Sequence, residues 1–516
     1  MRRPPLITAL LSPGAYPERP PDVTLVQTHI SYVFILPEVV YKIKKPVDFG
    51  FLDFSTLDKR RHYCEEEVRL NRRLAPDVYL GVVPITFNKG QAGVNGAGEP
   101  VEYAVKMRRV PDNALLYHAI KDGRAGPETM GKIARTIAAF HKTAETSERV
   151  AAFGQALMIG YNVEENFEQT ARFAGSIIGQ GRYERIKAYT RGFMIAEAGL
   201  FARRIDNGFI KDCHGDMHSE HVVVSDGIEI MDCIEFNERF RFSDTAADAA
   251  FLSMDLDFLG RHDLASVFDR AYCEASGDNE GCGSLMEFYR CYRAYVRGKV
   301  AAFKSIEQEV GEDEALEAYM DALRHFHLAG LYADGGYRPM LVVVRGLSGT
   351  GKTTLAQAIS QAADMPVVSS DIVRKRLAGM RTDEHASNAY NEGIYSPEFT
   401  DKTYNALIDE AGRMLASGRP VIVEATFASA GRLDAAIEAA IGAGARVRII
   451  ECRADDEIVK RNMAARAAIG TVSDADFAIY KRQKEGFEAT QAQYLIVNAA
   501  TTFKRNLRLS LEYIFN

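Results

Sequence analysis

The sequence of 516 residues is longer than a single ordinary domain and predicts two to four domains. It carries 63 Lys and Arg residues against 70 Asp and Glu residues, so the formal net charge is -7. The first 335 residues carry -9 and the remainder +2. This balance argues against a surface that is basic throughout, which a protein that coats nucleic acid or an anionic membrane would need.

The cysteines and the N-terminus indicate a cytoplasmic protein. Seven cysteines are scattered along the chain without a C-x-x-C pair, and this odd set predicts reduced thiols and no disulfide framework. The apolar run near the N-terminus is too short for a secretion signal. No later segment reaches an uncharged, membrane-spanning length, so we expect no membrane partner.

The first elements are paired strands, because apolar and polar residues alternate along residues 23–49. The strands are predicted at 23–27, 31–36 and 39–45. Lys42 and Lys44 share one face of the third strand, while Lys45 points to the other face. At least one of the first two can face a nucleotide, and the alternative is a pair of solvated edge-strand lysines.

A helix predicted at 59–74 follows, with glutamates at 65, 66 and 67. One of these carboxylates can pair with a strand lysine, although an ordinary charged helix face explains them equally well. Two further strands, at 79–87 and 102–107, bracket a glycine-rich hairpin, and most of 113–205 has a helical pattern.

The next cluster joins a tight loop to a strand and a second acidic position. Asp216 lies in the loop Asp212-Cys-His-Gly-Asp-Met-His-Ser-Glu-His221, and Asp232 follows sixteen residues later. Phosphoryl transfer to a hydroxyl needs such a pair, because one aspartate orients or deprotonates the acceptor while the other carries Mg²⁺.

This cluster resembles the H-x-D-x-x-x-x-N loop and the metal-binding aspartate of the aminoglycoside phosphotransferase and protein-kinase-like superfamily. The resemblance covers most of residues 20–330. It implies that Lys42 binds the ATP phosphates with Glu67 as its helix partner, that Asp216 is the base and that Asp232 is the metal ligand. The sequence departs from the superfamily at one point.

His221 stands where the superfamily has a metal-binding asparagine. A neutral imidazole is a poor ligand for Mg²⁺, which prefers oxygen, so Asp232, Glu235 or Asn237 would have to compensate. Two alternatives remain open. One is a zinc site of four residues on a helix face, and the other is an inactive, kinase-shaped scaffold with hydrogen-bonded histidines. The zinc ligands would be Cys213, His214, His218 and His221.

Residues 243–335 are predicted to be helical. Arg290, Arg293 and Arg297 follow helical spacing on one face, where they can contact an anionic substrate or, as the favoured interpretation, form a solvated basic stripe. Glycine and proline cluster at 333–339 and predict a linker that divides the chain at 335/336.

After the linker, an apolar strand enters a glycine-rich turn and leaves into a helical pattern. The spacing from Gly346 to Gly351-Lys352-Thr353 is that of a phosphate-binding P-loop, in which backbone N–H groups surround an anion. Lys352 would neutralise the β and γ phosphates, and Thr353 would hold Mg²⁺. The predicted nucleotide-binding residues of the loop are Gly346, Ser348, Gly349, Thr350, Gly351, Lys352, Thr353 and Thr354.

A short strand at 366–371 is predicted to end in Asp371, in the crevice where open α/β sheets bind their ligands. This carboxylate can act as general base for an attacking hydroxyl, and a helix N-cap is the alternative role. Arg374, one turn later, can hold the acceptor's anionic group or the transferring phosphate.

Two later elements can complete this site. A strand at 420–426 carries Glu424, which can hold Mg²⁺ through water or position the substrate. Another strand at 447–452 precedes a helix at 455–466, whose Arg461 and Arg466 can close over ATP as a lid or remain exposed helix charges.

Residues 340–500 resemble the small P-loop kinases that phosphorylate hydroxyls, namely polynucleotide 5′-kinases, gluconate kinase and zeta-toxin-like enzymes. The whole chain is similar to bacterial fusions of an aminoglycoside phosphotransferase-like domain with an ATP-binding domain. The expected fold is α/β and α+β in two domains. Residues 1–335 would have the protein-kinase-like fold, and 336–516 would form a P-loop NTPase with a parallel sheet flanked by helices.

The expected activity is ATP-dependent and Mg²⁺-dependent transfer of phosphate to a hydroxyl of a small molecule. One alternative is a kinase for the 5′-hydroxyl ends of RNA or DNA, whose binding would weaken steeply with salt. Another is a regulatory ATPase or nucleotide switch whose N-terminal half is a silent binding module.

Overall fold

The protein is described from a computed structural model, which covers residues 3–307, 310–381, 384, 392–469 and 477–516. The chain forms two compact units, each made of three segments. The N-terminal unit comprises Met1–Val163, Gly192–Asp255 and Ser266–Arg290, and the C-terminal unit comprises Glu164–Arg191, Leu256–Ala265 and Cys291–Asn516. Parts of the helical region before 335 therefore belong to the C-terminal unit, and a domain boundary at 335/336 stays a prediction.

The N-terminal unit begins with a six-stranded antiparallel sheet of order β1-β2-β3-β6-β4-β5. The strands are β1 Thr24–Gln27, β2 Ser31–Ile35, β3 Val39–Lys44, β4 Tyr79–Asn88, β5 Gln91–Val94 and β6 Glu102–Arg108. The predicted strand pairs are confirmed, and β5 adds a short edge strand within the glycine-rich hairpin.

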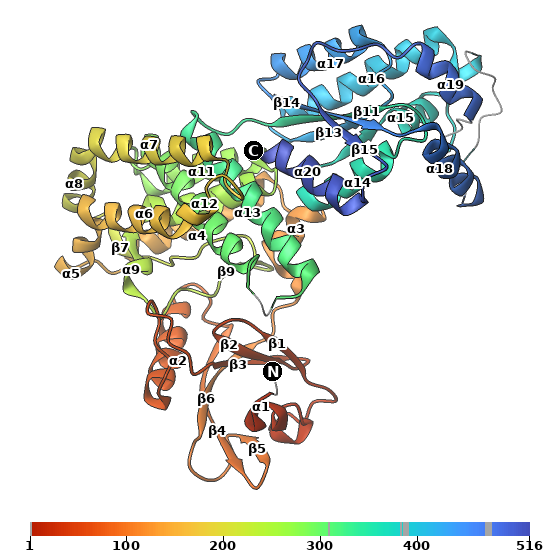
Figure 1. The fold of residues 1–516 in the computed structure, drawn as a ribbon. Coiled ribbons are helices and arrows are strands. Elements are labelled where there is room, and N and C mark those ends of the chain that lie inside the picture. Colours follow the sequence, from red (N-terminus) through yellow and green to blue (C-terminus); the bar gives the residue numbers. More distant parts are fainter. Residues whose placement is uncertain (1–2, 308–309, 382–383, 385–391, 470–476) are drawn as a thin grey trace. The chain divides into compact units, whose positions relative to one another are not determined.

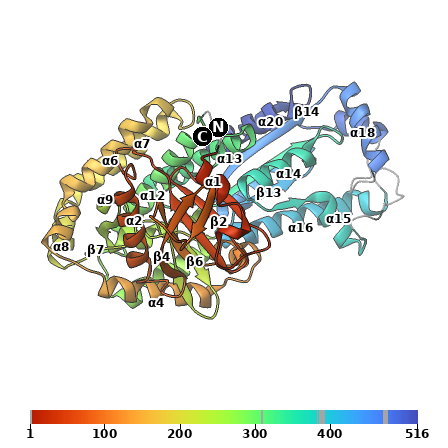
Figure 2. The same cartoon turned by 90° about the horizontal axis from the view of Figure 1, so that it is seen from below.

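Helix α2 (Leu57–Asn71) lies along one face of this sheet, against β4 and β6 (Figures 1 and 2). Its buried Cys64 and Val68 join Tyr79 and Val105 in one apolar cluster. The opposite face of the sheet packs on the first residues of the chain, including helix α1 (Pro5–Ala9). Because side chains alternate along a strand, β3 sends Tyr41 toward this second cluster and its lysines toward α2.

The rest of the N-terminal unit is helical with two short antiparallel strand pairs. The pairs are β7 Ile210–Asp212 with β10 Phe242–Asp244, and β8 Val222–Val224 with β9 Ile228–Ile230. The helices are α3 Leu116–Lys121, α4 Pro127–Thr143, α5 Glu148–Ala151, α8 Ala198–Asp206 and α9 Glu238–Arg241. Five further helices have residues in both units: α6 Ala156–Thr170, α7 Gln180–Ala196, α10 Thr245–Phe258, α11 His262–Ser276 and α12 Ser284–Lys304.

The C-terminal unit is built on a five-stranded sheet of order β12-β13-β11-β14-β15, in which all neighbouring pairs are parallel. The strands are β11 Met340–Gly346, β12 Val367–Ser369, β13 Val421–Glu424, β14 Arg446–Arg453 and β15 Leu495–Asn498. Burial on both faces explains the apolar run Met340–Val344 of β11. The prediction of a parallel sheet is confirmed.

Helices cover both faces of this parallel sheet. In Figure 1 α16 and α17 lie on one side of the strands, and α14 and α20 lie on the other. The helices of the unit are α13 Glu312–Ala333, α14 Lys352–Ala363, α15 Ser370–Leu377, α16 Pro397–Ala416, α17 Ala430–Gly442, α18 Asp456–Ile469, α19 Phe477–Glu485 and α20 Phe503–Phe515. Short 3₁₀ turns occur in the chain at Pro13–Ala15, Asp112–Ala114, Ala152–Gly154, Ala171–Phe173 and Gly393–Tyr395. Among the described residues, no helix is both long and apolar enough to span a membrane.

One disulfide corrects the prediction of seven reduced thiols. Cys273 and Cys282, nine residues apart, are bonded to each other, and the other five cysteines are buried and form no disulfide in the described structure. Spacing along the chain did not reveal the pair, because it closes the bend between α11 and α12 and belongs to no C-x-x-C motif.

The arginines of α12 are another correction, because they do not form a solvated stripe. Arg290 is buried and donates to Ser253, and it forms ion pairs with Asp269 and Glu287. Arg293 is also buried. The helix is covered on this face, so its charges serve internal packing.

A buried ion network fixes the bend that contains the disulfide. Arg204, with no exposed side-chain surface, donates to both carboxylate oxygens of Asp244 at 2.6 and 2.8 Å and also to Asp278. Asp278 lies between the two bonded cysteines and also accepts from the backbone N–H of Gly281 at 2.8 Å. These contacts tie the α11–α12 bend to β10.

We expect Arg204→Ala to destabilise the N-terminal unit by about 3–5 kcal/mol, because it leaves two buried carboxylates without their cation. The neighbouring Arg203 supplies a matched control, since its ion pair with Glu280 is exposed and should contribute less than about 1 kcal/mol. Urea unfolding followed by circular dichroism measures both variants. Equal losses in the two would contradict this account of the network.

Candidate functional site

The P-loop of the C-terminal unit joins the end of β11 to the start of α14. Gly346 has a φ of 143°, and a Cβ atom there would lie 2.4 Å from the carbonyl oxygen of Cys452. Gly351, immediately before α14, has a φ of 93°. Glycine is needed at both positions, at the first because the backbones approach closely and at the second because φ is positive. The loop leads directly into the N-terminus of α14, where backbone N–H groups can bind an anion.

Lys352 lies folded across this loop. Its Nζ donates to the carbonyl oxygen of Leu347 at 3.0 Å, and the Thr350 hydroxyl donates to the same oxygen at 2.8 Å. The lysine side chain is largely buried. A bound phosphate would offer this ammonium a charged partner in place of a neutral carbonyl.

Two helices distant in sequence contact the loop through side-chain amides. Asn462 of α18 donates to the carbonyl oxygen of Gly349 at 2.8 Å. Gln483 of α19 accepts from the backbone N–H of Ser348 at 3.1 Å. Neither residue was predicted from the sequence, because a single amide side chain in a charged helix belongs to no recognisable motif.

A buried carboxylate stands beside the loop at the end of β13. Glu424 accepts from the hydroxyls of Ser369 at 2.8 Å and Thr353 at 3.3 Å. Burial raises the pKa of Glu424, and the charge of Asp371 adds to this effect while Lys352 opposes it. The structure therefore brings Thr353 and Glu424 together, and their oxygen donors suit Mg²⁺.

Asp371 is placed one element later than predicted. β12 ends at Ser369, so Asp371 lies in the first turn of α15 and not at the end of the strand. Ser369 is paired in register with Glu424 at the end of β12, and Asp371 follows two residues later. The N-cap of α15 is Ser369, so the alternative role of Asp371 as a helix N-cap is wrong, although the helix dipole favours an acidic residue in the first turn.

Arg374 is buried and is held by residues 394–400. Its Nη1 donates to the carbonyl oxygen of Ile394 at 2.6 Å and to the Thr400 hydroxyl at 3.1 Å, and its guanidinium lies 4.9 Å from the ring centre of Tyr395. Burial lowers its pKa, although Asp371 opposes that shift. Its Nε is buried and has no hydrogen-bond partner among the described residues.

The two arginines of the predicted lid lie on α18. Arg461 is exposed on this helix, and the side chain of Arg466 is outside the described residues. A lid role for either stays a prediction.

The candidate site of the N-terminal unit is centred on Glu67, which has no exposed surface. Lys42 Nζ lies 3.0 Å from Glu67 Oε1, and Lys44 Nζ lies 2.7 Å from Glu67 Oε2. Lys42 also contacts Asp232 at 2.7 Å, while Lys44 contacts Glu235. The pairing of Lys42 with Glu67 agrees with the resemblance, whereas the buried role of Lys44 was missed.

Charge attraction dominates this cluster. Burial alone would lower the pKa of Lys42, but Asp232 and Glu67 outweigh it and the pKa is raised. Burial alone would raise the pKa of Glu67, yet the two lysines hold it below its usual value. The lysines and Glu67 are therefore charged near neutral pH.

The loop after β7 brings Asp216 close to two histidines. Asp216 Oδ2 lies 3.6 Å from His218 Nε2 and 3.6 Å from His221 Nδ1, and His221 Nε2 lies 3.5 Å from Asp232 Oδ2. Burial, and next the neighbouring His218, lowers the pKa of His221, so its ring is neutral near pH 7.

The zinc site considered on a helix face is not found. Residues 213–221 form a loop and turns, because Gly215 has a positive φ of 88° and approaches the carbonyl oxygen of Phe240 closely. Cys213 donates to the carbonyl oxygen of Ser243, and His214 contacts that of Met231. The four residues therefore do not converge as one ligand set.

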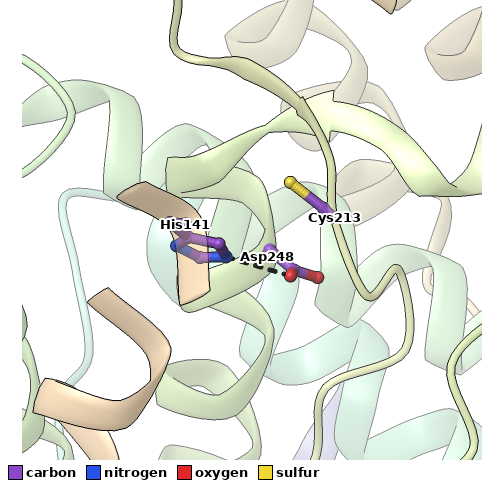
Figure 3. A group of neighbouring side chains, drawn as sticks. All are labelled: His141, Cys213 and Asp248. Atoms are coloured by element: carbon purple, nitrogen blue, oxygen red, sulfur yellow. Dashed lines mark hydrogen bonds and ion pairs between the residues drawn. The ribbon is translucent and has the colours of Figure 1, made fainter. Parts of the chain in front are cut away.

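A buried carboxylate on α10 holds the backbone of this loop. Asp248 accepts from the N–H groups of His214 at 2.9 Å and Gly215 at 2.8 Å. It also lies 3.1 Å from Nε2 of His141 (Figure 3). Nδ1 of His141 is 2.8 Å from the Tyr272 hydroxyl. Asp248 thus positions the residues that precede Asp216.

The role of Asp248 in holding this loop was also not predicted from the sequence. Burial alone would raise its pKa, but the donors from His141 and the backbone outweigh burial and lower it. The available signal was a carboxylate within the apolar run Ala246–Phe251, since an acidic residue on a buried helix face needs partners.

Comparison with known proteins agrees with the geometry of the P-loop. Residues 341–490 match the family model described as an AAA domain. The C-terminal unit therefore carries a P-loop nucleotide-binding domain. Over 459 residues, covering 89% of this chain and 89% of each relative, the sequence is 31% identical to uncharacterized protein Rv2004c of Mycobacterium tuberculosis and uncharacterized protein Mb2027c of Mycobacterium bovis. The chain belongs to the family of these mycobacterial proteins.

Two solved structures are similar to about a third of the chain. A gluconokinase from Sinorhizobium meliloti is 20% identical and covers 34% of this chain and 93% of its own, with a TM-score of 0.26. The APS kinase CysC of Mycobacterium tuberculosis is 16% identical and covers 35% of this chain and 99% of its own, with a TM-score of 0.27.

We expect Gln483→Ala to tighten nucleotide binding, because it frees the N–H of Ser348 for a phosphate. Loss of one competing hydrogen bond of about 1 kcal/mol corresponds to roughly fivefold in Kd. Fluorescent ATP titration measures the change, with Gln491→Ala as the control because that glutamine is exposed. Weaker binding in Gln483→Ala would show instead that the amide helps to hold the loop in its binding shape.

Proposed function

We propose that this protein is an ATP-dependent phosphotransferase whose C-terminal unit transfers the γ-phosphate of ATP to a hydroxyl group of a small molecule. One observation supports the proposal: Thr353 of the P-loop helix contacts the buried Glu424 at the carboxyl end of a parallel sheet, and the neighbouring strand β12 leads to Asp371 two residues after the position paired with Glu424. Phosphoryl transfer needs these parts together, because catalysis consists mainly of positioning and charge stabilisation.

Each residue of the C-terminal site has a separate role in this reaction. The N–H groups of the P-loop and Lys352 bind the β and γ phosphates of ATP. Thr353 and Glu424 would hold Mg²⁺, which when bound supplies positive charge to the phosphate oxygens. Asp371 orients the acceptor hydroxyl and receives its proton.

Arg374 is the candidate for contact with the acceptor or the transferring phosphate. Its Nη1 is fixed by Ile394 and Thr400, so the side chain is already oriented. A buried N–H such as its Nε is costly when unpaired, and an oxygen of the substrate would satisfy it. Arg461 and Arg466 would close over ATP as it binds.

We further propose that the N-terminal unit is a second, protein-kinase-like phosphotransferase site. The Lys42–Glu67 pair supports this, because an ordered lysine beside a helix glutamate is how that fold holds ATP phosphates. Asp216 would be the base of this site, and Asp232 would be its metal ligand.

Transfer from γ-labelled ATP to panels of sugars, aminoglycosides and 5′-hydroxyl oligonucleotides tests the assignment. We expect Asp371→Ala to lower labelling by a factor of roughly 10² to 10⁴, because the base is lost, while the Kd for ATP changes by less than about twofold. The exposed Asp434→Ala serves as the control. Full transfer by the Asp371→Ala variant would show that this carboxylate is not the base.

The same assay separates the two units. We expect Lys352→Ala to abolish transfer by the C-terminal site and Asp216→Ala to abolish transfer by the N-terminal site. Each variant should leave transfer by the other site unchanged. Labelling of oligonucleotide ends alone would identify a polynucleotide kinase. ATP hydrolysis without labelling of any acceptor would contradict the transferase proposal and favour a nucleotide switch.

A further inference from the structure

The disulfide of the N-terminal unit is accessible to solvent. Cys273 and Cys282 are both half-buried, and Glu274 and Gly283 beside them are exposed. The other five cysteines are buried in the part of the chain that the structure describes. A thiol in solution can therefore reach the bonded pair, whereas the remaining sulfur atoms are shielded. Accessibility of this kind distinguishes disulfides that exchange with other thiols from inert ones.

The disulfide closes a ring of the chain between α11 and α12, and this ring contains a buried carboxylate. Asp278 Oδ1 accepts from Arg204 and from the backbone N–H of Gly281. Its Oδ2 is also buried and has no hydrogen-bond partner among the described residues. A buried carboxylate oxygen without a donor is costly. The closed ring therefore helps to hold Asp278 in a position that an open, more mobile chain would exchange for contact with water.

The residue before the first cysteine connects the disulfide to the loop 213–221, which carries Asp216. Tyr272 is buried, and its hydroxyl lies 2.8 Å from His141 Nδ1. His141 Nε2 lies 3.1 Å from Asp248 (Figure 3). Asp248 in turn accepts from two backbone N–H groups of the loop. A chain of three buried side chains therefore leads from the disulfide to the backbone of this loop.

Asp278 provides a second connection from the disulfide to the same loop. Its partner Arg204 also donates to both carboxylate oxygens of Asp244, at 2.8 and 2.6 Å. Asp244 Oδ1 accepts from the backbone N–H of Ala246 at 2.8 Å, in the first turn of α10. This helix carries Asp248, so a displacement of Asp278 would disturb the start of the helix that holds the loop.

We propose that Cys273 and Cys282 are a redox modification site, at which a dithiol reductant opens the disulfide and thereby loosens the loop 213–221. One thiolate of the reductant attacks a sulfur atom, breaks the bond between the two cysteines and forms a mixed disulfide. The second thiolate then displaces the protein sulfur. The protein receives two electrons and two protons as two thiols, and the reductant leaves as its own disulfide.

Alkylation of the full-length protein tests the modification site. The protein is equilibrated with oxidised glutathione or with dithiothreitol, treated with iodoacetamide under native conditions, and digested for mass spectrometry. We expect Cys273 and Cys282 to be unmodified after the first treatment and alkylated after the second, while the buried Cys64 and Cys452 react slowly in both. Alkylation of the pair after oxidised glutathione, or its protection after dithiothreitol, would overturn the assignment.

Hydrogen exchange followed by mass spectrometry tests the effect on the loop, and it needs no assumption about phosphate transfer. We expect the amides of His214 and Gly215, which donate to Asp248, to exchange roughly fivefold faster after reduction, the factor for loss of about one hydrogen bond. The amides of β11 serve as the reference, because this strand lies in the C-terminal unit. Equal exchange of the loop before and after reduction would overturn the coupling.

The double variant Cys273→Ser/Cys282→Ser keeps the ring open without a reductant, so its loop should exchange like that of the reduced wild type and ignore dithiothreitol. Cys291→Ser is the matched control, because a serine hydroxyl can donate to the carbonyl oxygen that this thiol contacts, and it should respond as the wild type does. If the double variant folds poorly, Tyr272→Phe removes the contact with His141 while the disulfide stays intact. Loop exchange in that variant equal to that of the oxidised wild type would contradict the connection.

Discussion

Compensation of buried negative charge is the constraint on which both candidate sites depend. Glu67, Asp248 and Glu424 are each almost closed off from solvent. A carboxylate in such a position is costly unless cations or hydrogen-bond donors surround it. The three carboxylates have different partners. These partners determine which elements of the fold each carboxylate connects.

Glu67 is held by two lysines, which ties α2 to β3 with charged groups. Asp248 is held by backbone N–H groups and an imidazole, which ties α10 to the loop before Asp216. Among the residues that the structure describes, Glu424 accepts hydrogen bonds from the hydroxyls of Ser369 and Thr353. Its weaker compensation agrees with the raised pKa, and it leaves this carboxylate the most responsive of the three to an added cation.

Local patterns predicted the parts of these sites that depend on neighbouring residues in sequence. Strand alternation placed Lys42 and Lys44 on one face, and glycine spacing located the P-loop. Asp371 was misplaced because the sequence does not show whether the chain leaves the strand before or after Ser370. Such an error of two residues is common at element ends.

Contacts between distant segments were not predictable in this way. Gln483 reaches the P-loop from 135 residues away, and the disulfide depends on the bend between α11 and α12. The buried Arg290 has the same helical spacing as an exposed basic stripe, so only packing separates the two cases. The resemblance supplied Glu67 as partner of Lys42, but it gave no indication that Lys44 shares that carboxylate.

The unequal burial of the two lysines on β3 has a chemical consequence. The Lys42 side chain retains 16% of its surface and stands beside the partly open Asp232, whereas Lys44 retains 1% and is enclosed by Glu67 and Glu235. An amine-directed reagent diffusing in from solvent can therefore modify the first ammonium in the folded protein but not the second. Of the two neighbouring amines, one is available to incoming molecules and the other acts as a permanent internal counterion.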